Sequence, residues 1–189
     1  EIIPFLDAPP GTAFERQGPA GPFQQVGGDL WEPDTSPTAR VNPNWPPPGF
    51  PVVEGDCPIT SGWSIQLPER FARRVEDGQL VLWRPGLTIW LTAWNNDHDE
   101  SPRQRLAWLK KSASPERFAD EESRAGNVTR YSYRLRDENE QGPVEALYGF
   151  VIGDDGHLQL AIYFDDPADG TTARQLVESV VVQKPKGAG

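Results

Sequence analysis

The chain has one cysteine, two histidines and no methionine among its 189 residues. Cys57 has no second cysteine to pair with, so an internal disulfide is excluded and a small buried apolar side chain is expected there. No apolar run approaches the roughly 18 residues that a membrane-spanning helix needs. No signal peptide begins at Glu1. The sequence therefore predicts no membrane span and leaves a cytoplasmic protein and a processed periplasmic form both open.

Basic residues are also scarce. Lysine and arginine total 18 against 28 acidic residues, which gives a formal net charge of −10. Nucleic-acid binding needs a stripe of basic side chains that displaces counterions from the phosphates, and the sequence shows none. Nucleic acid is therefore not an expected partner. The acidity is typical of a surface that keeps a protein in solution, and a basic protein partner is the alternative.

Proline and aromatic residues are abundant at the N-terminal end. Thirteen of the 20 prolines lie in residues 1–60, most densely in NPNWPPPGFPVV (42–53). Proline fixes φ and lacks an N–H donor, so this region is not expected to form helices or inner strands. Its spaced aromatic side chains predict an extended arm, residues 1–60, that packs on a domain of residues 61–189. A ligand for an aromatic groove on another protein is the alternative. The aromatic residues of the arm are Phe5, Phe14, Phe23, Trp31, Trp45 and Phe50.

From residue 61 the pattern is that of a globular domain. The alternation in GWSIQL predicts a strand that ends at Pro68. Two more strands are predicted in QLVLW and LTIWLTAW, joined by Arg-Pro-Gly. The Pro-Gly pair suits a type II turn, which fits a two-residue hairpin poorly, so a longer loop is expected.

A helix is predicted in SPRQRLAWLKKSA, because Ser101 can cap its start, Pro102 suits its first position and Gln104 completes a capping box. A second short helical turn is expected in SPERFADEES. Three further strands follow in NVTRYSYRLRD, VEALYGFVIGD and HLQLAIYFD, and a last amphipathic helix ends near Val180. This order predicts an α+β fold, in which a mostly antiparallel six-stranded sheet carries helices packed on it as an α/β/α sandwich.

Three of the seven tryptophans lie in QLVLWRPGLTIWLTAWNN (79–96). Trp90 and Trp94 share one face of their strand, which would be an adhesive patch if it were left in water. Helices on opposite faces of the sheet would cover both sides. Helices on the same face would leave the tryptophans to the arm or, failing that, to a partner protein. The residues expected to contact a partner are therefore Trp90, Trp94, Trp31, Trp45 and Phe50.

A pattern of strands, turns and helices runs from residue 61 onward through WSIQLPERF, EDGQLVLW, LTIWLTAW, SPRQRLAWL and LAIYFDD…ARQLVESV. This pattern resembles the PsbP-like superfamily, which includes the photosystem protein PsbP, a Ran-binding nuclear import factor and bacterial proteins associated with type VI secretion. The proline-rich first 60 residues lie outside the resemblance. It implies an antiparallel sheet between helical layers and a non-enzymatic role, since members bind proteins or assist their assembly.

Two stretches are candidates for catalytic chemistry. NNDHDES holds Asp97, His98 and Asp99, and YFDDPADGT holds Asp165 and Asp166. Consecutive residues rarely converge on one metal ion, and no second histidine stands at a ligand spacing, so polar loops that precede helices are expected instead. The chain also has no phosphate-binding loop and no G-x-S-x-G or H-E-x-x-H motif. No metal and no cofactor are expected.

The sequence thus favours a non-catalytic protein-binding or accessory module, acting as a chaperone or assembly factor of a bacterial secretion system. A small hydrolase that uses the Asp/His cluster is one alternative. A structural domain of an envelope assembly is the other. The expected partner is another protein, whose identity the residues do not indicate.

Overall fold

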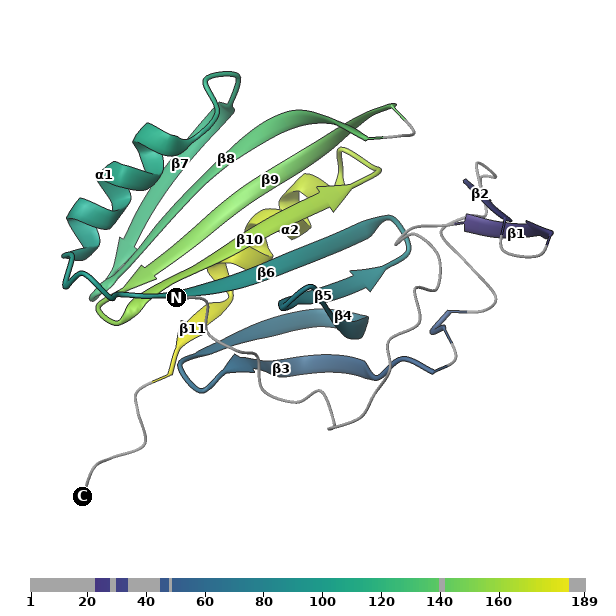
Figure 1. The fold of residues 1–189 in the computed structure, drawn as a ribbon, viewed down its shortest axis with the longest axis horizontal. Helices are drawn as coiled ribbons and strands as arrows, with labels where there is room; N and C mark the ends of the chain where they lie inside the picture. Colours follow the sequence, from purple (N-terminus) through teal and green to yellow (C-terminus); the bar gives the residue numbers. More distant parts are fainter. Residues whose placement is uncertain (1–22, 28–29, 34–44, 48, 140–141, 184–189) are drawn as a thin grey trace.

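The structure is a computed structural model that describes residues 23–27, 30–33, 45–47, 49–139 and 142–183. Strands dominate these residues, and two helices accompany them (Figure 1). In chain order the elements are β1 Phe23–Gly27, β2 Leu30–Pro33, β3 Val52–Thr60, β4 Trp63–Glu76, β5 Gln79–Arg84, β6 Leu87–Asn95, α1 Pro102–Ser112, β7 Phe118–Ala125, β8 Val128–Asn139, β9 Gly142–Gly153, β10 Gly156–Phe164, α2 Asp169–Glu178 and β11 Val180–Val182.

Nine strands form one antiparallel sheet, while β1 and β2 pair as a separate hairpin. The order across the sheet is β11-β4-β5-β6-β10-β9-β8-β7, and β3 pairs with the other edge of β4. β4 is long enough to pair with β11 along its first residues and with β5 along its last. Most neighbours are consecutive in the chain, but β6 pairs with β10. After β6 the chain therefore passes through α1 to the far edge of the sheet at β7, and β8 and β9 fill the places between β7 and β10.

The six-stranded α/β/α sandwich predicted from the sequence is wrong. The structure is mostly antiparallel sheet, with nine strands in that sheet and only two helices among the described residues. β3 was missed because it lies in the proline-rich region, and its residues stand on the arm side of the boundary drawn at residue 60. β7 was missed because its charged sequence FADEESRA looks helical. β11 has three residues, too few to leave a periodic pattern.

Three local predictions can be compared with the structure. The Ser101–Gln104 capping box is confirmed: the Ser101 side chain accepts from the Gln104 backbone N–H, and the Gln104 side chain accepts from the Ser101 backbone N–H at 2.9 Å. The longer loop expected between β5 and β6 is wrong, because only Pro85 and Gly86 separate the two strands, with Gly86 at φ 77°. Pro68 does not end its strand, since β4 continues to Glu76 past a register shift in its pairing with β3.

One face of the sheet packs against α2 and forms the main core. Leu80, Ile89 and Leu160 alternate inward along β5, β6 and β10 and are fully buried in one cluster. Leu176 and Val177 of α2 belong to the same cluster. Each large apolar side chain buried in this way contributes roughly 1.5–3 kcal/mol, so this layer dominates the stability of the fold.

The opposite face is covered differently at its two ends. Leu109 of α1 packs with Tyr131 and Phe150 over β8 and β9. Trp45 and Phe50, which precede β3, pack over β4 and β5. The two helices therefore lie on opposite faces of the sheet, and α1 stands at the β7–β8 end, away from β5 (Figure 1).

Candidate functional site

The candidate site is the part of the sheet between these two covers, on the face that turns away from α2. We call it the tryptophan face. Antiparallel pairing brings side chains of β5, β6, β10 and β9 onto it in cross-strand rows. It consists of Val81, Trp83, Thr88, Trp90, Thr92, Trp94, His157, Gln159, Ala161, Tyr163, Ala146, Tyr148 and Phe150.

The arm occupies the β5 end of the tryptophan face. The Phe50 ring meets the Trp83 ring edge to face, with ring centroids 4.9 Å apart and planes at 83°. Trp45 packs against the same small cluster. The carbonyl of Pro51 accepts a hydrogen bond from the backbone N–H of Arg73 at 2.8 Å, which fixes the end of the segment to β4. Two aromatic side chains that precede β3, Trp45 and Phe50, thus pack on this face.

Trp90 stands next to that contact and is only half-buried. Its cross-strand neighbour on β10 is Ala161, whose methyl group covers little of an indole ring.

Beyond Ala161, the hydroxyls of Tyr148 and Tyr163 lie 3.0 Å apart, and Tyr148 donates to Asp137 at 3.3 Å. Tyr163 must therefore donate to Tyr148, because an ionised carboxylate only accepts. Burial, followed by the hydrogen bond with Tyr163, raises the pKa of Tyr148, so the Tyr148 hydroxyl stays protonated and neutral.

Trp94 lies at the other end of the tryptophan face. Its ring stacks on His157, with centroids 6.2 Å apart and planes at 9°. Arg105 of α1 donates from Nη1 to Nδ1 of His157 at 3.1 Å, which requires a neutral ring that carries its proton on Nε2. Glu100, at 2.6 Å, and Asn96, at 3.1 Å, hold the guanidinium. Burial, and secondarily the charge of Arg105, lowers the pKa of His157 to about 4. His157 therefore serves to anchor α1 on the face.

Two polar groups of the tryptophan face make no hydrogen bond with the described residues. The Trp94 indole N–H is buried and meets no hydrogen-bond acceptor there. Such an orphan donor costs roughly 1–3 kcal/mol, so it calls for an explanation. The side chain of Gln159 is half-buried in the adjacent row and also makes no hydrogen bond within that part of the chain. Aromatic rings beside unused donors are the composition of a binding surface.

The sequence-based partner residues fall into three groups. Trp45, Phe50 and Trp90 come together around one cluster at the β5 end. Trp94 shares their face but stands at its other end, on His157. Trp31 lies in β2, and its side chain is outside the described residues.

The members of the site that were not predicted from the sequence include Trp83, Tyr148, His157 and Tyr163. The alternation in GHLQLAIYF was available as a signal, because it places His157 and Tyr163 on one face of β10. What the sequence did not contain was the pairing of β10 with β6, which brings these residues beside Trp90 and Trp94.

The residues of the hydrolase alternative lie apart from this face. Asp97, His98 and Asp99 are exposed in the loop between β6 and α1. Asp166 accepts the backbone N–H of Ala168 at 2.8 Å just before α2. Within the residues that the structure describes, no three His, Cys, Asp or Glu side chains gather as a metal site would require.

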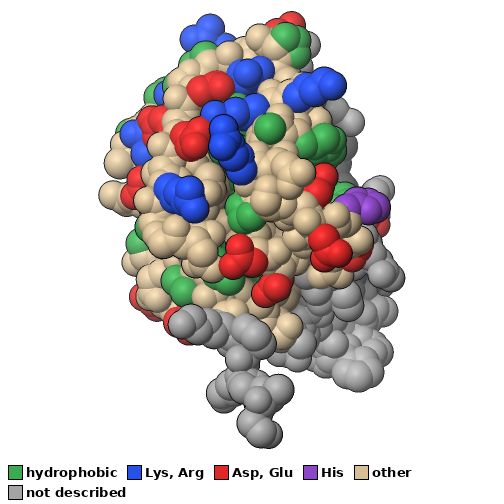
Figure 2. All heavy atoms as spheres, turned by 90° about the vertical axis from the view of Figure 1, so that its left-hand side faces the viewer, with side chains coloured by type: hydrophobic (Ala, Val, Ile, Leu, Met, Phe, Trp, Pro, Cys, Tyr) green, Lys and Arg blue, Asp and Glu red, His purple; other side chains and the backbone are tan. Residues whose placement is uncertain are grey.

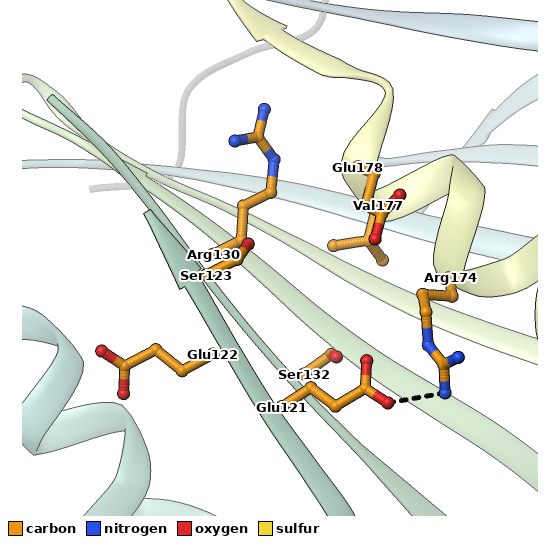
Figure 3. A pocket seen from close by; sticks show the side chains of 8 residues that line it. All are labelled: Glu121, Glu122, Ser123, Arg130, Ser132, Arg174, Val177 and Glu178. Carbon is orange, nitrogen blue, oxygen red and sulfur yellow. Dashed lines mark ion pairs between the residues drawn. The ribbon is translucent and has the colours of Figure 1, made fainter. Parts of the chain in front are cut away.

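A polar hollow of about 300 Å³ lies on the opposite side of the sheet, between β7, β8 and α2 (Figure 3). Arg174 and Glu121 pair across it at 2.7 Å. Arg130 is turned toward the C-terminal end of α2 and donates to the carbonyl of Val180 at 2.8 Å, where the helix dipole favours a cation. The Nε of Arg130 is buried and has no hydrogen-bond partner among the described residues. Arg174 and Glu121 pair with each other and Arg130 holds the end of α2, so the hollow is a weaker candidate than the tryptophan face.

The surface at the α1 and β7 end has no dominant sign of charge. Figure 2 shows lysine and arginine side chains lying among aspartates and glutamates there. Lys110 of α1 pairs with Glu122 of β7 at 2.6 Å, and Arg117 pairs locally with Asp120 at 3.0 Å. This end of the protein is therefore suited to solvent and local ion pairs and offers no strong field for a charged ligand.

No family model and no curated protein matches this chain. Neither α1 nor α2 has the length and apolar character that crossing a lipid bilayer would take, and this holds for the described residues.

Proposed function

We propose that this protein is a non-catalytic binding module that holds another protein on its tryptophan face. The single observation that carries the proposal is the half-buried state of Trp90 and Trp94 on one sheet face, between α1 and the arm. A few residues carry most of the binding energy in protein interfaces, and tryptophan and tyrosine are enriched among them. A chaperone or assembly role in a bacterial secretion system, which the PsbP-like resemblance implies, is the finer form of the same proposal.

The surroundings of these indoles support a binding role over a catalytic one. Two titratable groups of the face are held in their neutral forms, because Tyr148 has a raised pKa and His157 a lowered one. Neither is poised near neutral pH, as a general acid or base would be. The face instead offers aromatic rings for packing, a kind of side chain that is enriched in protein interfaces.

Affinity capture from the native cell, with matched variants of the full chain, tests the proposal. Trp90→Ala and Trp94→Ala remove indoles from the face. Trp108→Ala removes a tryptophan that is 54% exposed on α1 and belongs to none of the described clusters, so it is the matched control. We expect one protein to be retained by the wild type and by Trp108→Ala and lost from the other two. A partner retained equally by all four proteins would contradict the proposal.

A further inference from the structure

We infer that the polar hollow between β7, β8 and α2 binds a small organic molecule that carries one carboxylate. The hollow lies on the α2 side of the sheet, so this site is separate from the tryptophan face and goes beyond the proposed function. Its volume of about 300 Å³ is at the lower end of the range for small-ligand sites, which suits a small molecule and not a protein.

Antiparallel pairing places four side chains of the hollow in two adjacent rows. Ser123 of β7 is paired with Arg130 of β8, and Glu121 is paired with Ser132. Ser132 is in turn paired with Gly149 of β9, which lies directly against α2. Side chains of paired residues share one face of a sheet, so all four point to the side that α2 covers. Figure 3 shows them around the hollow.

Ser132 supplies a hydroxyl without a partner. The residue is only 8% exposed, and its side chain makes no hydrogen bond with the described residues. Its oxygen is not among the fully enclosed polar atoms, so a ligand in the hollow can reach it. A buried hydroxyl is normally hydrogen-bonded, because it has given up most of its contact with water. Ser123, in the neighbouring row, also makes no side-chain hydrogen bond with that part of the chain.

Arg130 supplies a positive charge that no carboxylate balances among the described residues. The residue is half-buried, and its Nη2 donates to the carbonyl of Val180. Its Nε is fully enclosed, but its Nη1 is not and has no partner in the described chain, so Nη1 is the donor that a ligand can meet. A guanidinium that is partly removed from water without a counter-charge is unfavourable, and a carboxylate supplies both the charge and the acceptor oxygens.

The glutamates around the hollow limit the charge that a ligand can carry. Glu121 is paired with Arg174 at 2.7 Å, and Glu122 is turned toward α1, where it pairs with Lys110 at 2.6 Å. Glu178 is exposed, so water and salt screen its charge. One unbalanced guanidinium therefore favours a ligand with a single negative charge, whereas a doubly charged phosphate would be repelled by the glutamates nearby.

NMR titration of the isotope-labelled full chain with butyrate tests the inference. Butyrate has one carboxylate and a short aliphatic chain that can pack on Val177, which lines the hollow. Butyramide has nearly the same shape and no charge, so it is the control probe. We expect saturable shifts of the backbone amide signals of Arg130 and Ser132 with butyrate and none with butyramide.

Three variants then locate the contact. Arg130→Gln removes the charge and keeps an N–H donor for the carbonyl of Val180, and it should weaken butyrate binding about tenfold or more. Ser132→Ala removes the hydroxyl and should weaken binding about three- to tenfold. Arg124→Gln removes the same charge from an exposed side chain of β7 that does not line the hollow, so it should leave the affinity unchanged.

The inference is overturned by the absence of saturable shifts with butyrate, by equal binding of butyramide, by an affinity that ignores both Arg130→Gln and Ser132→Ala, or by an equal loss in Arg124→Gln. Tighter binding of inorganic phosphate than of butyrate would also reject a monocarboxylate ligand. Circular dichroism identifies any variant that fails to fold, and Ser132→Ala, the milder change, decides the test if Arg130→Gln does not fold. Capture of a protein on the tryptophan face is a separate result, because the two sites lie on opposite sides of the sheet.

Discussion

Gly149 of β9 lies directly against Val177 of α2. A Cβ atom added at Gly149 would overlap Cγ2 of Val177 and stand 3.0 Å from Cγ1. The absence of a side chain at this position therefore sets how closely α2 approaches the sheet. The buried cluster beneath α2 depends on that approach, because Leu176 and Val177 reach the main core from the same helix.

We expect Gly149→Ala to destabilise the protein by about 1–3 kcal/mol, because the added methyl group must push Val177 or α2 outward. Val177→Ala removes the obstructing atoms, so Gly149→Ala should cost much less in that background. The double-mutant cycle, measured by urea unfolding, isolates this coupling. Equal costs of Gly149→Ala in both backgrounds would show that the close approach does not limit the packing of α2.

The edge strand β7 contains a second backbone feature that predicts a measurable effect. Ala119 has φ 54°, at a register shift between Phe118 and Glu121. A residue with a Cβ atom in this left-handed region is strained by roughly 1–2 kcal/mol, and glycine removes that strain. Glycine also gives the unfolded chain more conformational freedom, which offsets part of the gain. We expect Ala119→Gly to raise the free energy of unfolding by about 0.5 kcal/mol. Ala125→Gly, in the same exposed strand but without a positive φ, should lower it. Matching effects at the two positions would refute the explanation.

The features that could be predicted from the sequence are those whose determining interactions are local. The capping box at Ser101 and Gln104 involves residues three apart and was predicted correctly. The strand pairing was out of reach because it joins distant segments. β10 pairs with β6 across more than sixty residues, and no periodicity along the chain encodes that choice. In β7 the local pattern itself was misleading. The strand lies exposed at the edge of the sheet and accepts a charged sequence, which a local pattern assigns to a helix.

The candidate site was predictable to the same extent. Alternation in LTIWLTAW placed Trp90 and Trp94 on one face, as the structure has them. The grouping of Trp45, Phe50 and Trp90 around one cluster required the β4–β5 hairpin and the arm to meet, which depends on tertiary structure.

The contact between the arm and the sheet makes a spectroscopic prediction. Phe50→Ala should remove the ring that covers Trp83, which is 7% exposed in the folded protein. We expect increased acrylamide quenching and a red-shifted tryptophan emission, with a loss of stability of about 1–3 kcal/mol. Phe118→Ala is the control, because Phe118 is 37% exposed on β7 and lies against Arg134 and Arg136. Unchanged quenching in Phe50→Ala would mean that the arm does not shield Trp83 in solution.

The buried His157 predicts how stability responds to acid. Its folded-state pKa of about 4 lies below the ordinary value of 6.5, because burial and Arg105 disfavour the charged ring. Between these two values the unfolded chain binds a proton that the folded protein excludes. The contribution of His157 to the free energy of unfolding should therefore be fully present above pH 6.5 and fall as the pH drops toward 4, by up to about 3 kcal/mol.

Carboxylates also titrate in this range, so the wild type must be compared with variants. His157→Gln, which keeps an acceptor for Arg105, should flatten the decline in unfolding free energy, whereas His98→Gln should not, because His98 is exposed. Parallel curves for the wild type and His157→Gln would mean that the histidine next to Trp94 does not set the acid response.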